Sequence, residues 1–291
     1  MAVWNLGSIN ADLVYTVPHL PAPGETLAAQ ELNRYLGGKG ANMSVAAARA
    51  GSHVHHVGAV GADGAWAVER LLEYGVDTRY IGYSSDPTGH AIIAVEAGGE
   101  NLIIIYPGAN RSLDAHEIWQ ALGNAQAGDT LIIQNETNAQ VETARLGSEI
   151  GMRVCYAAAP FDAEAVKSVL PFLDLLILNE VEARQLQEAT GSAPADLPVS
   201  DVIVTLGSKG AEHFDTKTGE NRVYPAVPVT AVDSTGAGDT FTGYVLSGLD
   251  RGLPMAQAIT MATRAGAIMV TRHGTADVIP DLKDVLEMSQ G

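Results

Sequence analysis

Short apolar runs alternate along this chain with segments of helical periodicity. Helical segments lie between most of these runs. One of them is expected to have Asp63 as its N-terminal cap and to end at Gly75. The apolar runs, which we interpret as strands, are residues 54–60, 131–133, 153–157, 175–178 and 202–205. This alternation predicts an α/β fold, with a mostly parallel central sheet covered by helices on both faces and ligands at the carboxyl ends of its strands.

One region interrupts the alternation. Residues 90–96 and 101–106 flank Ala97-Gly98-Gly99-Glu100, which is typical of a β-hairpin with a glycine turn. Isoleucines at 92, 93, 103 and 104 leave both faces of this hairpin partly apolar. A hairpin with apolar faces is expected to cover a site or to pair with another surface. No linker, repeat or low-complexity segment divides the chain, so we expect one domain over residues 1–291.

Composition narrows the possible partners. The 291 residues are 46% hydrophobic and 18% charged, an ordinary globular balance, and the net charge is −17. This charge argues against binding to nucleic acid or to an anionic membrane surface. No signal-peptide pattern and no apolar run near 20 residues is present, so a cytoplasmic location is expected. The one cysteine, Cys155, lies in an apolar run and is expected to be a buried thiol.

The most informative segment is Asp233-Ser234-Thr235-Gly236-Ala237-Gly238-Asp239-Thr240-Phe241, between an extended run at 227–232 and a helical pattern. Backbone N–H groups at a helix start have no partners inside the helix, and the helix dipole favours anions there. Asp239 in such a turn is either a helix cap or a base that takes a proton from a nucleophile attacking a bound phosphate.

A second glycine-rich turn, Gly37-Gly38-Lys39-Gly40-Ala41-Asn42, precedes an Ala-rich helix that Gly51 is expected to end. It is not a Walker A loop, because Gly40 follows Lys39 where Ser or Thr is required. Taken alone, this turn indicates only a tight connection before a helix.

Together the two turns resemble the paired signatures of the ribokinase-like (PfkB) family of sugar and nucleoside kinases, and within it the ribokinase branch. Further matches follow in the family's order along the chain: residues 7–12, 107–110, 134–136, 179–182 and 205–210. The resemblance runs from about Leu6 to about Pro280 and implies a three-layer sandwich with a small β-strand lid. That lid would be built from about residues 10–36 and 88–106, and in this family it often clasps the lid of a second subunit, which implies a homodimer.

The resemblance assigns roles to residues in both turns. Asp239 matches the catalytic base, and the amides of Gly236, Ala237 and Gly238 would form the anion hole. The positions that match sugar contacts are Asn10, Asp12, Gly38, Lys39, Asn42 and Glu136, with Asp239 beside them. Carboxylates and amides suit this task because a sugar hydroxyl both donates and accepts hydrogen bonds; singly, Asn10 and Asp12 could instead be turn residues.

Other positions match nucleotide and metal contacts. Those for the nucleotide are Asn179, Thr205, Gly207, Ser208, Gly210, Gly238 and Thr263. Glu182 matches a residue that holds Mg²⁺ through water, although Asn179 and Glu182 also have the spacing of a helix capping box. The family also binds a monovalent cation, which is potassium. The positions that match its contacts are Asp233, Thr235, Met269, Arg272 and Gly274.

Two features do not follow from the resemblance. Tyr156-Ala157-Ala158-Ala159-Pro160 stands where the family usually has Asn-Pro-Ala-Pro, which affects fine substrate specificity. His53 and His55 share one strand face with His56 opposite. Without a third ligand nearby they do not make a structural zinc site, and we expect packing or surface roles for them.

The resemblance therefore implies an ATP-dependent sugar kinase that uses Mg²⁺ and potassium and transfers the γ-phosphoryl group to a primary hydroxyl, with O5 of D-ribose favoured. Another pentose, a ketohexose or a nucleoside are alternative acceptors, and a catalytically inactive sugar-binding regulator is an alternative of another class. The sequence contains only four Phe and three Trp, with none beside Asn10 or Glu136, which weakens the nucleoside alternative.

Overall fold

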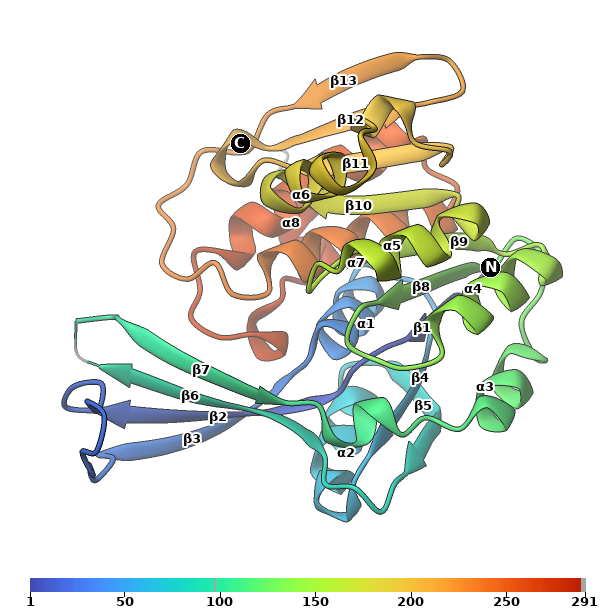
Figure 1. The fold of residues 1–291 in the computed structure, drawn as a ribbon. Helices are drawn as coiled ribbons and strands as arrows, with labels where there is room; N and C mark the ends of the chain where they lie inside the picture. The colour runs from blue at the N-terminus through green and yellow to red at the C-terminus, as the bar shows by residue number, and fades with distance from the viewer. Residues whose placement is uncertain (97, 289–291) are drawn as a thin grey trace.

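The computed structural model describes residues 1–96 and 98–288. In this part of the chain the strands form a nine-stranded sheet and a four-stranded sheet (Figure 1). In spatial order, the strands of the large sheet are β13 (Glu220–Tyr224), β12 (Ala211–Asp215), β11 (Asp201–Thr205), β10 (Leu175–Asn179), β9 (Arg153–Ala157), β8 (Thr130–Gln134), β1 (Val3–Leu6), β4 (Val54–Val60) and β5 (Val76–Tyr83).

The large sheet is parallel from β11 to β5 and antiparallel only at β12 and β13. Strands β1, β4 and β8 are buried along their whole length, as expected for strands covered on both faces. All five predicted strands are confirmed, with boundaries that shift by at most one residue. The central sheet is therefore mostly parallel, as predicted.

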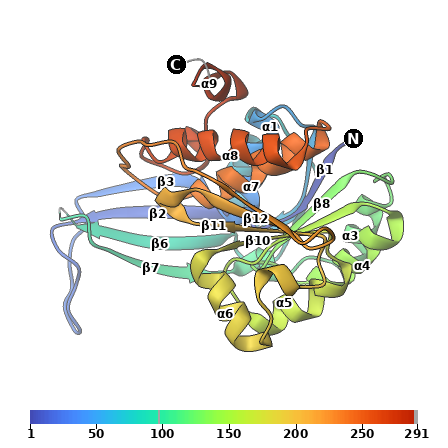
Figure 2. The same ribbon diagram turned by 90° about the horizontal axis from the view of Figure 1, so that it is seen from above.

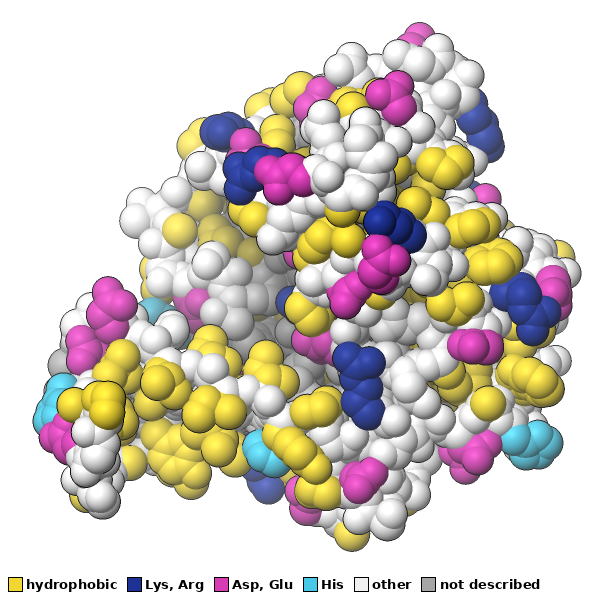
Figure 3. Space-filling model, viewed as in Figure 1, with side chains coloured by type: hydrophobic (Ala, Val, Ile, Leu, Met, Phe, Trp, Pro, Cys, Tyr) yellow, Lys and Arg dark blue, Asp and Glu magenta, His cyan; other side chains and the backbone are white. Residues whose placement is uncertain are grey.

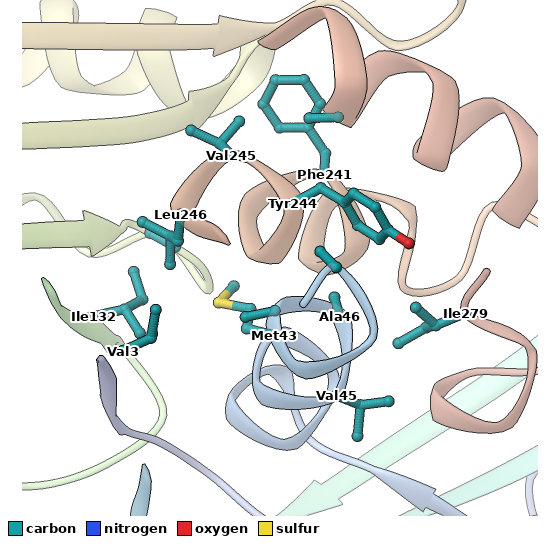
Figure 4. Close-up of a cluster of buried hydrophobic side chains, with 14 of the residues drawn as sticks. Val3, Met43, Val45, Ala46, Ile132, Phe241, Tyr244, Val245, Leu246 and Ile279 are labelled. Carbon is teal, nitrogen blue, oxygen red and sulfur yellow. The ribbon is translucent and has the colours of Figure 1, made fainter. Parts of the chain in front are cut away.

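Helices cover both faces of the large sheet, and Figure 2 shows the resulting three layers. One face carries α1 (Lys39–Arg49), α2 (Ala65–Glu73), α7 (Ala237–Asp250), α8 (Met255–Met269) and α9 (Leu282–Glu287). The other carries α3 (Ala115–Leu122), α4 (Gln140–Ile150), α5 (Ala163–Val169) and α6 (Glu180–Thr190). Each layer has its own apolar core; Figure 4 shows side chains of α1 and α7 packed with Val3 and Ile132 of the sheet.

The small sheet has the strand order β3 (Glu31–Gly37), β2 (Asn10–Val17), β6 (Gly89–Glu96) and β7 (Asn101–Tyr106). It extends from the side of the molecule (Figure 1). Strands β6 and β7 form the predicted hairpin, although Ala97 of its turn lies outside the described residues. Strand β2 pairs with β6 in parallel and with β3 in antiparallel fashion. These strands fall within the two segments that we expected to build a lid.

Residues 227–232 form no strand, and Pro228 within them cannot donate a ladder hydrogen bond. One local expectation was wrong. Asp63 does not cap α2, which begins at Ala65 after a short 3₁₀ turn; its carboxylate instead accepts hydrogen bonds from the backbone and the hydroxyl of Thr88. In the described part of the chain, the helices are too short or too polar to cross a lipid bilayer.

Candidate active site

The two glycine-rich turns meet at the starts of α1 and α7. Gly38 precedes α1 with φ 91° and Gly236 precedes α7 with φ 72°, backbone angles that favour glycine. A Cβ on Gly243 would lie 2.5 Å from the Cβ of Ala46, so glycine is needed there for the two helices to pack closely. The packing places the first turn of each helix beside the other.

Asp239 lies in the first turn of α7 and is buried. Its Oδ2 accepts a hydrogen bond of 2.9 Å from Nδ2 of Asn42 on α1. The carbonyl oxygen of that Asn42 amide is buried and has no hydrogen-bond partner among the described residues. A buried polar atom without a partner is costly, so this oxygen is available to a hydroxyl donor from a ligand.

The start of α7 also has free backbone donors. The amide of Ala237 donates to the carbonyl of Ser234 at 3.2 Å. Within the described chain, the amides of Gly236, Gly238 and Asp239 have no such partner. Free donors for the predicted anion hole are therefore present at Gly236 and Gly238, whereas the amide of Ala237 is already used. The anion hole itself stays a prediction.

Polar side chains from the first half of the chain surround this helix start. Glu136 follows β8, and its Oε2 accepts hydrogen bonds from the hydroxyl of Ser8 and, at 3.1 Å, from the backbone amide of Lys39. These contacts hold the loop after β1 and the turn before α1 together. Gly40 allows their close approach, because a Cβ there would lie 2.4 Å from the Cα of Gly7.

Two of the predicted sugar residues lie on the small sheet. Asn10 and Asp12 share one face of β2, and Oδ1 of Asn10 accepts a hydrogen bond of 2.8 Å from Asn110. The carboxylate of Asp12 lies over Gly37, where a Cβ would come within 2.1 Å of its Oδ2. We did not assign roles to Ser8, Gly37 or Asn110 from the sequence, although all three belong to the motifs that matched the family.

These groups are close enough to shift each other's pKa values. Burial, followed by the negative charges of Glu136 and Asp239, raises the pKa of Asp12 to about 7. The charge of Asp239, with those of Glu136 and Glu182, raises the pKa of Lys39 against the opposing effect of burial. Lys39 is thus a cation among carboxylates from several segments of the chain. Figure 3 shows the hollow in this region, between the small sheet and the rest of the molecule.

Asn179 and Glu182 form a capping box at the start of α6. Oδ1 of Asn179 accepts from the amides of Val181 and Glu182, and Oε2 of Glu182 accepts from the amide of Asn179 at 2.7 Å. The structural interpretation of this pair is confirmed. Burial raises the pKa of Glu182, and its other oxygen, Oε1, has no hydrogen-bond partner in the described chain.

A cavity of about 520 Å³ lies at the start of α7, on the side away from the predicted sugar residues. Six of the seven predicted nucleotide residues line it: Thr205, Gly207, Ser208, Gly210, Gly238 and Thr263. Asn179 is outside this lining. The sequence reasoning missed the apolar walls, which come from Ala226, Val227, Pro228, Val229, Ala231, Phe241, Gly266, Ala267 and Val270. Residues 227–232, expected to be extended, thus form a wall of the cavity.

The residues predicted to hold a monovalent cation lie around the loop before α7. The carboxylate of Asp233 accepts from the amides of Thr235 at 2.9 Å and Gly274 at 3.4 Å. The carbonyl of Met269 already accepts from the amide of Arg272. These residues lie close together, and cation binding by them stays a prediction.

Comparisons with known proteins identify the family of this chain. A model of the pfkB family of carbohydrate kinases matches residues 3–282. The chain is 35% identical to the ribokinase of Haemophilus influenzae, over 97% of this chain and 96% of that one. It is 33% identical to the deoxyribokinase of Salmonella typhi, over 97% and 96%. The structure of Arabidopsis thaliana ribokinase complexed with ribose and ATP superposes with a TM-score of 0.87 at 28% identity, covering all of both chains.

Proposed function

Because this chain belongs to the pfkB family of carbohydrate kinases, we propose that it transfers the γ-phosphoryl group of ATP to O5 of D-ribose, yielding D-ribose 5-phosphate. One observation carries the proposal. Asp239 lies at a helix start that has the polar cluster of Asp12, Asn42 and Glu136 on one side and the 520 Å³ cavity on the other. A sugar and a nucleotide bound on these two sides would meet at its carboxylate.

Asp239 then acts as the base. It accepts the proton of the attacking hydroxyl as the new O–P bond forms and the bond to the leaving ADP oxygen breaks. The free amides of Gly236 and Gly238 stabilise negative charge on the transferring phosphoryl group. Asn42 holds Asp239 through the 2.9 Å hydrogen bond and offers its unpartnered carbonyl oxygen to a sugar hydroxyl.

Mg²⁺ arriving with ATP would neutralise phosphate charge, and the open Oε1 of Glu182 is a suitable oxygen donor for its water shell. The carboxylate of Asp233 and backbone oxygens near Thr235 and Gly274 would hold potassium. The whole chain acts as one kinase domain, and the exposed apolar face of the small sheet pairs with that of a second copy.

A 2-deoxypentose is the second candidate acceptor, because a deoxyribokinase is among the relatives. Release of ADP should be measured with ribose, 2-deoxyribose, other pentoses, ketohexoses and nucleosides at equal concentration. We expect the highest kcat/KM with ribose. A higher value for 2-deoxyribose would reassign the substrate, and no turnover with any acceptor would favour the inactive sugar-binding regulator.

A further inference from the structure

His53 and His55 lie at the end of the sheet opposite to the candidate active site. His53 immediately precedes β4, and Asp77 is the second residue of β5. The strand register pairs His55 with Asp77, which puts both side chains on one face of the sheet. The structure thus places a carboxylate beside the two histidines, which their spacing in the sequence does not reveal.

The three side chains converge on one point. One imidazole nitrogen from each histidine and one carboxylate oxygen of Asp77 all lie within 4.8 Å of one another. Nδ1 of His55 is 2.8 Å from Oδ2 of Asp77. The ring of His53 stands edge-on to that of His55, with centroids 4.5 Å apart at 89°.

The group is partly prepared for a ligand. His55 is buried and stacks on Trp4, with ring centroids 4.0 Å apart, so its position is fixed by the core. His53 is exposed and can turn toward an incoming ion.

We propose that His53, His55 and Asp77 bind one divalent transition-metal ion such as Zn²⁺, with water completing the coordination. Two imidazoles and a carboxylate are a ligand set that suits Zn²⁺. Ligands at about 2.0–2.1 Å around a tetrahedral ion are about 3.3 Å apart, so the site must contract by up to about 1.5 Å. Rotation of His53, the exposed member, supplies this movement.

Arg79 competes with the ion for Asp77. Its Nη2 lies 2.6 Å from Oδ2 of Asp77, and its Nε donates to both carboxylate oxygens. The Arg79 side chain is 69% exposed and can swing into solvent. The ion must displace it, so removal of this guanidinium should tighten metal binding.

The test is calorimetric titration of the chelator-treated full chain with Zn²⁺ alone, without nucleotide. We expect one ion per chain, binding at least tenfold weaker in His53→Ala and in Asp77→Asn, and several-fold tighter in Arg79→Gln. His116→Ala, at an exposed histidine on α3, is the matched control and should bind as the parent does. With Zn²⁺ at one hundred times its Kd, the Tm of the parent should be on the order of 5 °C higher than without the ion.

Equal Zn²⁺ affinity in the parent and in both His53→Ala and Asp77→Asn would overturn the site. Weaker binding in Arg79→Gln would overturn the role of Arg79 as competitor. Mg²⁺-dependent turnover should be the same in His53→Ala as in the parent, because none of these residues lies in the candidate active site.

Discussion

The amide of Asn42 donates a hydrogen bond of 2.9 Å to the carboxylate of Asp239, a residue 197 positions later in the chain. This bond joins the first turns of α1 and α7, which the two glycine-rich segments begin. The proposed base is thereby held by the part of the chain that carries the sugar residues. Its orientation depends on both halves of the molecule.

Replacement of Asp239 tests the base directly. Asp239→Asn keeps the shape of the side chain but cannot accept a proton, so turnover should fall about 10²-fold or more while ribose binding is largely retained. Asp196→Asn, at an exposed position away from the site, is the control. A variant that keeps more than a tenth of the parental kcat would remove Asp239 from the role.

The sugar contacts are tested by truncation. Asp12→Ala and Glu136→Ala should each weaken ribose by about 1–3 kcal/mol, because a buried hydroxyl loses its partner, and should affect ATP much less. Titration calorimetry with each ligand measures both effects. Glu142→Ala, exposed on α4, should change neither. Unchanged ribose affinity in both site variants would show that the pocket is elsewhere.

Asp12 should also make stability depend on pH. Its pKa is about 7 in the folded chain and about 4 in an unfolded one. The folded state therefore holds the proton more tightly, and its stability falls as the pH rises from about 4 to about 7. Asn resembles the protonated acid, so Asp12→Asn should raise the free energy of unfolding at pH 8 by on the order of 1–4 kcal/mol. Urea unfolding should show a much smaller gain at pH 4.5, where the folded chain keeps the proton and the unfolded chain has begun to lose it. The same gain at both pH values would contradict the shift.

Gly266 offers a way to fill the nucleotide cavity. It lies on α8 in the cavity lining, and a Cβ there would meet nothing within 4 Å. Gly266→Leu should raise the KM for ATP at least tenfold while ribose binding is kept. Gly266→Ala is the control: it leaves most of the space open and should stabilise the helix by up to about 1 kcal/mol. Unimpaired ATP binding in the Leu variant would place the nucleotide outside this cavity.

The small sheet should mediate dimerisation. Its register puts Ile103 and Ile105 on the same face as Asp12, and Leu102 and Ile104 on the other. All four are exposed, with Ile105 at 60%. We predict a homodimer in which one face of the small sheet forms the contact. If that face carries Ile103 and Ile105, changing both to Lys should give monomers. If it is the opposite face, changing both Leu102 and Ile104 to Lys should do so. Leu72→Lys on α2 is the control. Light scattering that finds the parent monomeric at micromolar concentration would exclude the dimer.

The sequence predicted features that depend on local composition. The strand predicted at residues 153–157 is confirmed, because its apolar run is bounded by helical segments. The cavity wall at 227–232 was not predicted, because an extended run of β-type residues gives no signal of what it will contact. Asp63 was taken for a helix cap because its distant partner, Thr88, cannot be recognised from spacing.

The candidate site shows the same limit. The glycine turns and Asp239 were recognisable because their residue types and order are unusual. The unpartnered oxygen of Asn42 and the pairing of His55 with Asp77 depend on contacts between separate elements, for which a single sequence gives no signal. Strand register and helix packing decide such contacts.

The proposed sugar residues other than Asp239 all lie between Asn10 and Glu136, whereas the cavity lining begins only at Thr205. In our proposal, acceptor recognition and phosphate-donor binding therefore depend on separate segments of the chain. Substitutions in the first of these segments can therefore change the acceptor without changing any residue that lines the cavity. The two segments must still match where α1 packs on α7, through Ala46 and Gly243 and through Asn42 and Asp239. A chimera of two such kinases that keeps this match should prefer the acceptor of the parent that supplies its N-terminal segment.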